Sequence, residues 1–356
     1  MPFPSDVREK TEFDYIVVGS GAGGGPLAAR LALAGYSVLV LEAGSNQAAL
    51  ELTDGPREVT EVPAFNAVST EHPDLSWQFF VKHYENDPCG KDEKWNPPAG
   101  MPDNDPEKRG IFYPRAAALG GCTVHNAMIT IAGPDSDWDD LADFLRDDSW
   151  RAATMRPYFQ RLERNEYRDR PNPPPRDRWR RVRDNVRWLF GYGPDYTGGR
   201  HGFDGWLRTS MTDLRIGLKD WELIFMLWAA FKSAKHRGIV PIFTLLYRIA
   251  RGRAKQTVDP NDAQTQAESP AGLALVPLAV CGKDSPAGDG TGPSLHKRGH
   301  RSGPREFLLE TQAALRKRAR ELETAPDRAG NRIGRIEIAT EHFVTRLIFE
   351  DELAQA

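Results

Sequence analysis

The sequence predicts an α/β fold with a parallel sheet, in a chain of about two domains. Two observations carry this prediction. A strand pattern, a helix pattern and a second strand pattern follow one another within residues 13–44, and this order builds a parallel βαβ unit. The chain has 356 residues, which is enough for about two domains.

The residue types within this region indicate each element of the βαβ unit. Tyr15–Val18 is a short run of β-branched and aromatic residues, which is typical of a buried strand. Pro26–Ala34 is rich in alanine and leucine, which favour helices, and Gly35 follows as a helix-ending glycine. Ser37–Leu41 is a second apolar run and predicts the second strand.

Further elements are predicted along the rest of the chain. Apolar positions within residues 137–166 indicate helices, and residues 305–323 indicate a charged helix. Residues 335–349 have the pattern of a strand. Residues 45–110 and 282–304 are loop-rich, because glycine, proline and polar residues dominate them.

Two segments between these elements are unusual. Residues 167–200 are dense in arginine and proline, so we expect a solvated surface insertion, with an anion-binding patch as the alternative. Residues 219–252 contain the apolar runs Leu223–Phe231 and Ile239–Ile249, and both are shorter than the ~20 residues that span a bilayer. They predict a helical hairpin on the domain. A lid, a dimer contact and a peripheral membrane contact are the alternatives.

Composition and charge exclude several classes of protein. The chain has 47 Lys and Arg against 50 Asp and Glu, whereas a general nucleic-acid binder is usually basic. The cysteines, Cys89, Cys122 and Cys281, are too far apart to predict a disulfide framework or a metal site. The polar N-terminus has no apolar core of signal-peptide length, so we expect a cytoplasmic protein.

The glycine-rich turn of the βαβ unit predicts a dinucleotide site. Gly19, Gly21 and Gly24 fit G-x-G-x-x-G between a strand and a helix, which is the context that this motif needs. Glu42 ends the second predicted strand, where a carboxylate accepts hydrogen bonds from ribose hydroxyls and repels a 2′-phosphate. NADP is therefore disfavoured. The motif leaves FAD and NAD open, and a glycine-rich turn without a ligand is the third alternative.

A second glycine-rich segment narrows the choice of cofactor. The run Pro114–Met128, together with Asp14–Gly25 and Leu39–Gly44, resembles the glucose–methanol–choline family of FAD-dependent oxidoreductases, and its choline-oxidase-like and choline-dehydrogenase-like members in particular. Weaker similarities lie in Leu75–Phe79, His201–Gly205, Ser302–Leu308 and Phe343–Phe349.

The resemblance implies a set of FAD contacts. The segment from Gly120 to Met128 would lie along the flavin ring, where small residues let the backbone come close. Val344 would contact the adenine through its main chain, and Arg115 would support the loop or the pyrophosphate. The residues expected to bind FAD are Gly19, Ser20, Gly21, Ala22, Gly23, Gly24, Glu42, Ala43, Arg115, Gly120, Gly121, Cys122, His125, Asn126, Ala127 and Val344.

His125 raises the question of covalent attachment. Choline-oxidase-like members of the family have a histidine at this place that is joined to the 8α-methyl carbon of the flavin. A neutral imidazole nitrogen is a competent nucleophile for such a bond. The alternative is a histidine packed beside a non-covalent flavin. Cys122 is expected to be a small packing residue, because nothing near it marks it as a nucleophile.

The resemblance places the catalytic residues outside this sequence. In the family a histidine, paired with a second histidine or an asparagine, accepts the alcohol proton while hydride moves to flavin N5. Both lie beyond the position that corresponds to residue 356, so we expect an N-terminal portion of the family fold whose C-terminal part is missing. The other histidines are expected on the surface or in loops, namely His72, His83, His201, His236, His296, His300 and His342.

The expected organisation and function follow from this resemblance. Residues 10–165 and 295–356 would form the FAD-binding domain, and residues 166–294 would form an α+β substrate or cap domain that interrupts it. The expected reaction is oxidation of a small-molecule alcohol, with electrons passing to oxygen or a quinone-type acceptor, and with no metal or nucleic acid involved. The alternatives are a flavin-binding fragment without activity, an NAD-linked dehydrogenase and a protein that binds the membrane surface.

Overall fold

The structure is a computed structural model, and its described residues form two compact units. Unit 1 comprises residues 1–127 and 303–356, and unit 2 comprises residues 128–302. The domain boundaries expected after residues 165 and 294 divide the chain by function, and they stay a prediction. The described residues are 12–46, 56–82, 93–97, 105, 108–171, 179, 198–211, 222, 225, 259–262, 266, 275–283, 298–324 and 333–349.

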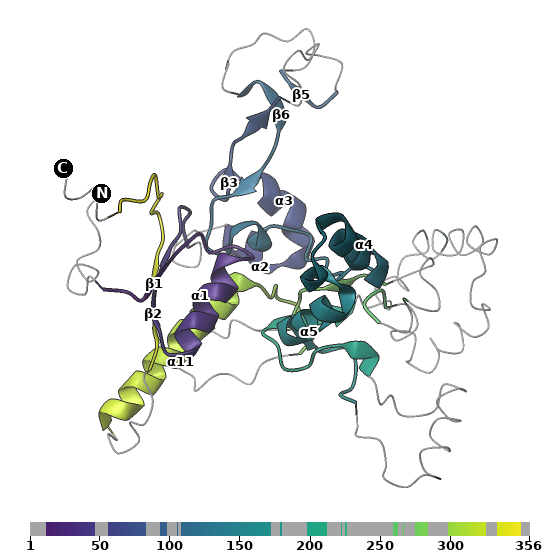
Figure 1. Ribbon diagram of the computed structural model, residues 1–356. Coiled ribbons are helices and arrows are strands. Elements are labelled where there is room, and N and C mark those ends of the chain that lie inside the picture. Colours follow the sequence, from purple (N-terminus) through teal and green to yellow (C-terminus); the bar gives the residue numbers. More distant parts are fainter. Residues whose placement is uncertain are drawn as a thin grey trace. The chain divides into compact units, whose positions relative to one another are not determined.

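Unit 1 is built on a parallel sheet with two helices packed against it. Strand β2 lies in the middle, between β1 and β11, and both pairings are parallel. Helices α1 and α11 run side by side next to this sheet (Figure 1). The predicted α/β class with a parallel sheet is therefore confirmed. The bounds are Tyr15–Val18 for β1, Gly24–Leu33 for α1, Ser37–Leu41 for β2, Pro304–Thr324 for α11 and Arg335–Ala339 for β11.

Small side chains bring α1 close to the sheet and to α11. The three alanines at 28, 29 and 32 are fully buried, so the backbone of α1 comes near its neighbours. The sheet contributes β-branched residues, which pack well on a pleated surface. The core consists of Val17, Ala28, Ala29, Ala32, Val38, Val40, Leu119, Leu308, Leu315 and Ile336.

The last predicted strand is shorter in the structure than in the sequence. The pattern predicts a strand over residues 335–349, but β11 ends at Ala339. Ala339 pairs with Leu41, the last residue of β2, so the neighbouring strand ends there as well. The chain continues without strand pairing, and Phe343 and Phe349 are 72% and 67% exposed. A strand pattern therefore forms a strand only as far as a partner strand extends.

The rest of unit 1 consists of short helices and two small antiparallel sheets. One sheet pairs β3 with β7, and the other places β6 between β4 and β5. The bounds are Pro56–Glu61 for α2, Pro63–Phe65 for the 3-10 turn η3, Asn66–Glu71 for α3, Ser76–Trp77 for β3, Phe80–Val81 for β4, Trp95–Asn96 for β5, Gly110–Phe112 for β6, Arg115–Ala116 for β7 and Gly121–Val124 for the 3-10 turn η5.

Unit 2 combines a helical pair with a mixed sheet. The helical region predicted over residues 137–166 is two helices, α4 and α5, and its last residues form strand β8. Strand β9 pairs with β8 in parallel and with β10 in antiparallel fashion. The bounds are Asp135–Leu145 for α4, Asp148–Trp150 for the 3-10 turn η6, Ala152–Leu162 for α5, Glu163–Asn165 for β8, Gly198–Arg200 for the 3-10 turn η7, Leu207–Met211 for β9 and Pro277–Leu278 for β10.

Several sequence predictions concern residues outside the described part. These include Cys89, most of the arginine- and proline-rich segment 167–200, and nearly all of the apolar segment 219–252. His83, His236 and His296 lie outside it as well. In the part of the chain that the structure describes, no helix has both the length and the hydropathy needed to cross a bilayer.

Candidate functional site

The first glycine-rich turn has the tight geometry that the motif predicts. Gly19 has a left-handed φ of +87° and donates its N–H to the carbonyl of Leu41 at 2.8 Å. A methyl carbon added at Gly24 would lie 2.0 Å from the carbonyl oxygen of Gly19. Only a glycine at this position lets the first turn of α1 pack against the end of β1. The first N–H groups of a helix have no intrahelical partners and favour anions.

The second glycine-rich segment lies against the first one. The Gly120 N–H donates to the hydroxyl oxygen of Ser20 at 2.8 Å. Gly121 is left-handed, with φ +58°, and a methyl carbon added there would lie 2.9 Å from the Cα of Gly21. The two motifs are about a hundred residues apart in the sequence, and the structure brings their backbones into contact. A surface made of backbone alone lets a flat ligand approach closely.

Glu42 is buried and is hydrogen-bonded to the first glycine-rich turn. Its Oε2 accepts hydrogen bonds from the N–H and the hydroxyl of Ser20, and its Oε1 accepts from the Gly44 N–H at 2.9 Å. A carboxylate has about four acceptor positions, so one remains for a donor such as a ribose hydroxyl. The structure therefore places Glu42 where the fingerprint needs it, at the end of β2 beside the glycine turn.

The chain after β11 runs past Glu42. The His342 N–H donates to the Glu42 carbonyl and the Glu341 N–H donates to the Gly44 carbonyl, both at 2.9 Å. Ala43 lies between these contacts. Val344 follows two residues later and is half-buried. The segment expected to contact adenine is thus near the residue expected to contact ribose.

The remaining predicted residues occupy the turn η5 and its flanks. The Cys122 thiol accepts a hydrogen bond from the Ala116 N–H at 3.5 Å, and the Cys122 carbonyl accepts from the Asn126 N–H at 3.0 Å. These contacts hold Cys122 in the turn, and its expected role as a packing residue stays a prediction. Asn126 and Ala127 are exposed, and Arg115 is exposed on β7. Their backbones and side chains are accessible to a ligand.

His125 is 4% exposed and its backbone is held in place. The hydroxyl of Thr70 donates to the His125 carbonyl at 3.0 Å, and the His125 N–H donates to the Cys122 carbonyl at 3.4 Å. The ring therefore projects from a fixed backbone position at the end of η5. Thr70 was not singled out in the sequence, because a threonine in α3 has no local signal for this contact.

Arg305 is a second residue that sequence reasoning missed. It is 6% exposed, in the first turn of α11, and a methyl carbon added at Gly120 would lie 2.9 Å from its Cβ. Its guanidinium donates to the Asn46 side-chain oxygen at 3.3 Å and pairs with Glu306 at 3.2 Å. A buried arginine fixes the distance between α11, the second glycine segment and the loop after β2. In the sequence, Arg305 is one of many charged residues in the predicted helix, so nothing distinguishes it from the others.

The described glycines and polar groups fit a dinucleotide. Beside Gly19 and Gly23 an added methyl carbon would meet nothing within 4 Å, and beside Gly21 only the backbone of Gly120 and Gly121. The site therefore offers open backbone on one side and buried acceptors on the other. This is the donor and acceptor set that pyrophosphate and ribose require.

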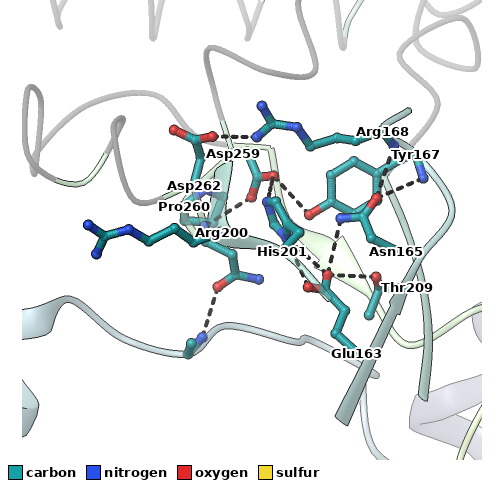
Figure 2. A network of polar contacts seen from close by, with 12 residues as sticks. Glu163, Asn165, Tyr167, Arg168, Arg200, His201, Thr209, Asp259, Pro260 and Asp262 are labelled. Carbon is teal, nitrogen blue, oxygen red and sulfur yellow. Dashed lines mark hydrogen bonds and ion pairs between the residues drawn. The ribbon is translucent and has the colours of Figure 1, made fainter. Parts of the chain in front are cut away.

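Unit 2 holds a second polar cluster around His201. His201 was expected on the surface or in a loop, and it lies in the loop between η7 and β9, but its side chain is only 1% exposed. It lies between the carboxylates of Glu163 and Asp259, as Figure 2 shows. The physical reason is that a carboxylate oxygen lies 2.9 Å from each ring nitrogen, so a protonated ring is balanced by two anions. No pattern in the sequence near His201 indicates contacts with residues that are so distant along the chain.

Comparisons with known proteins agree with the geometry of unit 1. No protein-family model matches the sequence. The chain is 34% identical over 155 residues to dehydrogenase eriK of Hericium erinaceus, which covers 43% of this chain and 21% of that protein. It is 27% identical over 154 residues to the oxygen-dependent choline dehydrogenase of Photobacterium profundum, covering 43% of this chain and 22% of that protein.

A solved structure gives independent support for the fold. The crystal structure of a formate oxidase matches this chain with a TM-score of 0.52 at 16% identity, covering 95% of this chain and 40% of that one. At this identity the likeness concerns the fold alone. The chain matches about a fifth of the length of the curated relatives named above.

Proposed function

We propose that the protein is a glucose–methanol–choline oxidoreductase, which binds FAD in unit 1 and oxidises an alcohol; the similarity to dehydrogenase eriK and to oxygen-dependent choline dehydrogenase supports this proposal. The observation that carries the proposal is the Ser20 hydroxyl, which donates to Glu42 and accepts from Gly120. This one group joins the nucleotide fingerprint, the ribose acceptor and the second glycine segment. A site for NAD needs only the first two of these.

Each part of the site has its own task in holding the cofactor. The N-terminal amides of α1 bind the pyrophosphate, and the free acceptor position of Glu42 binds a ribose hydroxyl. The backbone of Gly120–Ala127 supports the flat ring and holds water away from it. Bound FAD supplies a two-electron acceptor for the hydride of an alcohol carbon.

His201 is not suited to act as the base for the alcohol proton. A general base must be able to take up a proton, but His201 is ion-paired through both ring nitrogens. We therefore assign cofactor binding to unit 1 and assign the base to none of the described residues. A flavin-binding protein without alcohol turnover is the alternative that this arrangement favours.

Anaerobic reduction separates these two functions. The full chain is mixed with a panel of primary, aromatic and sugar alcohols without oxygen, and flavin absorbance near 450 nm is followed. Bleaching by one alcohol class and its return on admission of air support the proposed oxidation. A flavin that dithionite reduces and no alcohol reduces would leave binding in place and remove the enzymatic part.

Denaturing mass spectrometry decides the state of His125. A covalent flavin adds the mass of FAD to the chain, and the substitution His125→Ala then removes that addition while leaving bound, extractable FAD. A chain mass without the addition shows a non-covalent flavin beside the buried ring. Peptide mapping identifies the attachment residue in the first case.

A further inference from the structure

Unit 2 is organised around one buried imidazole. We define the His201 cluster as Glu163, Tyr167, His201, Thr209 and Asp259 (Figure 2). The Nδ1 of His201 lies 2.9 Å from the Oε2 of Glu163, and its Nε2 lies 2.9 Å from the Oδ2 of Asp259. Asp259 is fully buried, and the Glu163 side chain is 14% exposed.

The other contacts of the two carboxylates show that both are acceptors. Glu163 accepts from the Gly202 N–H at 3.0 Å and from the Thr209 hydroxyl at 2.9 Å. Asp259 accepts from the Tyr167 hydroxyl at 2.8 Å and from a backbone N–H at 2.9 Å. Neutral imidazole has only one N–H, so one of its nitrogens would direct a lone pair at a carboxylate. The arrangement is satisfied when both nitrogens are protonated.

The charges around the cluster agree with a protonated ring. Burial alone would lower the pKa of His201, but the contacts with Asp259 and Glu163 outweigh it and raise the pKa to about 9. The ring of Tyr167 meets the imidazole edge-on with centroids 5.6 Å apart. The adjacent Arg168 is paired with Asp262, so that cation is already balanced by an anion.

The cluster lies where two long chain segments begin and end. One chain segment lies between Tyr167 and His201, and a second lies between Thr209 and Asp259, so both begin and end at residues of the cluster. Bringing two distant points of a chain together costs conformational entropy, so the groups that hold these points must supply a compensating interaction. The ion pairs of His201 hold the ends of both segments.

We propose that His201 is a clamp that is charged at neutral pH, and that its imidazolium holds together the ends of two chain segments, the one between Tyr167 and His201 and the one between Thr209 and Asp259. The charge, rather than the packing of the ring, gives the clamp its strength, because both partners are anions in a buried position. Loss of the charge leaves two neighbouring carboxylates that repel each other. The clamp is independent of cofactor binding in unit 1.

Hydrogen exchange in the full chain tests the clamp with a matched control. His201→Gln keeps a polar side chain but loses the charge, and His300→Gln changes a half-buried histidine of the same unit. At pH 7 we expect peptides that cover residues 201–209 and 259–262 to exchange about a hundredfold faster in the His201 variant. The His300 variant should stay within about threefold of the wild type. Equal exchange in the two variants would overturn the proposal.

A measurement on the wild-type chain covers the case in which His201→Gln does not fold. Nitrogen NMR of labelled histidine distinguishes imidazolium from either neutral tautomer, and variants at the other histidines assign the signals. The proposal expects both ring nitrogens of His201 to carry protons at pH 7.5 and to lose one near pH 9. A neutral ring at pH 7.5 would show that the clamp is not charged.

Discussion

The Ser20 hydroxyl connects three segments that are distant in the sequence. It lies in the first glycine turn, donates to Glu42 at the end of β2, and accepts from Gly120 in the second glycine segment. All three groups are buried. A serine in the fingerprint is thus more than a spacer between glycines, because it fixes the relative position of the two segments that are proposed to hold the cofactor.

Removing this hydroxyl should weaken cofactor binding more than folding. Ser20→Ala leaves the Gly120 N–H and one Glu42 oxygen with fewer partners, and a lost hydrogen bond to a charged group costs on the order of 1.5–3 kcal/mol. We expect FAD to bind the refolded apoprotein at least about tenfold more weakly, as measured by quenching of flavin fluorescence.

A second buried serine provides the control for this substitution. Ser69 donates to Asn66 within its own helix region, so Ser69→Ala removes a local bond only. Its FAD affinity should stay within about twofold of the wild type. An equal loss of affinity in both variants would contradict the role of Ser20.

Sequence reasoning works at the residue scale where partners are neighbours in the chain. The fingerprint glycines and Glu42 were predicted because strand, turn and helix are contiguous. The loop position of His201 was predicted but its burial was not, because its partners Glu163 and Asp259 lie far from it in the sequence, and no local pattern encodes them. Arg305 was missed for the same reason, since its contact with Asn46 spans most of the chain.

Among the elements, the junction of β1 and α1 tolerates no side chain at Gly24. The added methyl carbon of Gly24→Ala would lie 2.0 Å from the Gly19 carbonyl, whereas Gly23→Ala places its methyl carbon in open space. Gly23 also has a φ of −91°, which alanine adopts without strain. Overpacking costs about 1–3 kcal/mol.

Thermal unfolding of the two apoproteins compares these glycines directly. We expect Gly24→Ala to lower the melting temperature by several degrees and Gly23→Ala to leave it nearly unchanged. The apoprotein is used because a bound ligand would add its own stabilisation. If both variants unfold at the wild-type temperature, the turn is less tight than the structure shows.

The packing of α11 on α1 and the sheet depends on Leu308. This side chain is fully buried in the core of unit 1, and Leu308→Ala should cost about 2–5 kcal/mol in the free energy of unfolding. Leu27, which is 54% exposed on α1, is the control, and Leu27→Ala should change that free energy by less than about 1 kcal/mol. Urea denaturation measures both, and equal effects would mean that α11 does not pack as described.

The predicted helices and strands match the structure where the hydrophobic pattern and the residues that end a helix indicate the same boundaries. The strands at 15–18 and 37–41 have the predicted bounds, and α1 begins slightly earlier than its alanine-rich part. The last strand was overextended, because residues 340–349 continue an apolar pattern without a neighbouring strand to pair with. The residue types show that a segment is suited to form a strand, but the strand forms only where a neighbouring strand is available for backbone hydrogen bonds.

For the molecule as a whole, the His201 cluster predicts a stability that declines at alkaline pH. The folded pKa of about 9 lies above the unfolded value of about 6.5. The stabilisation is therefore fully present below pH 6.5 and is lost as the pH rises through 9. This pKa difference corresponds to about 3 kcal/mol.

Calorimetry over pH tests this linkage. We expect the wild-type melting temperature to fall between about pH 6.5 and 9, and the difference between wild type and His201→Gln to shrink over the same interval. Other groups titrate in this range too, so the difference between the two proteins is the quantity of interest. A difference that stays constant from about pH 6 to 10 would contradict the charged ring.

The proposed function rests on one property of the whole chain, which is that it binds FAD. The most direct measurement is the visible spectrum of the purified full chain, followed by identification of the cofactor released or retained on denaturation. The account predicts oxidised-flavin bands near 370 and 450 nm, and FAD as the cofactor. A colourless protein that fails to bind added FAD but binds NAD would contradict the account, because the second glycine segment would then have no flavin to contact.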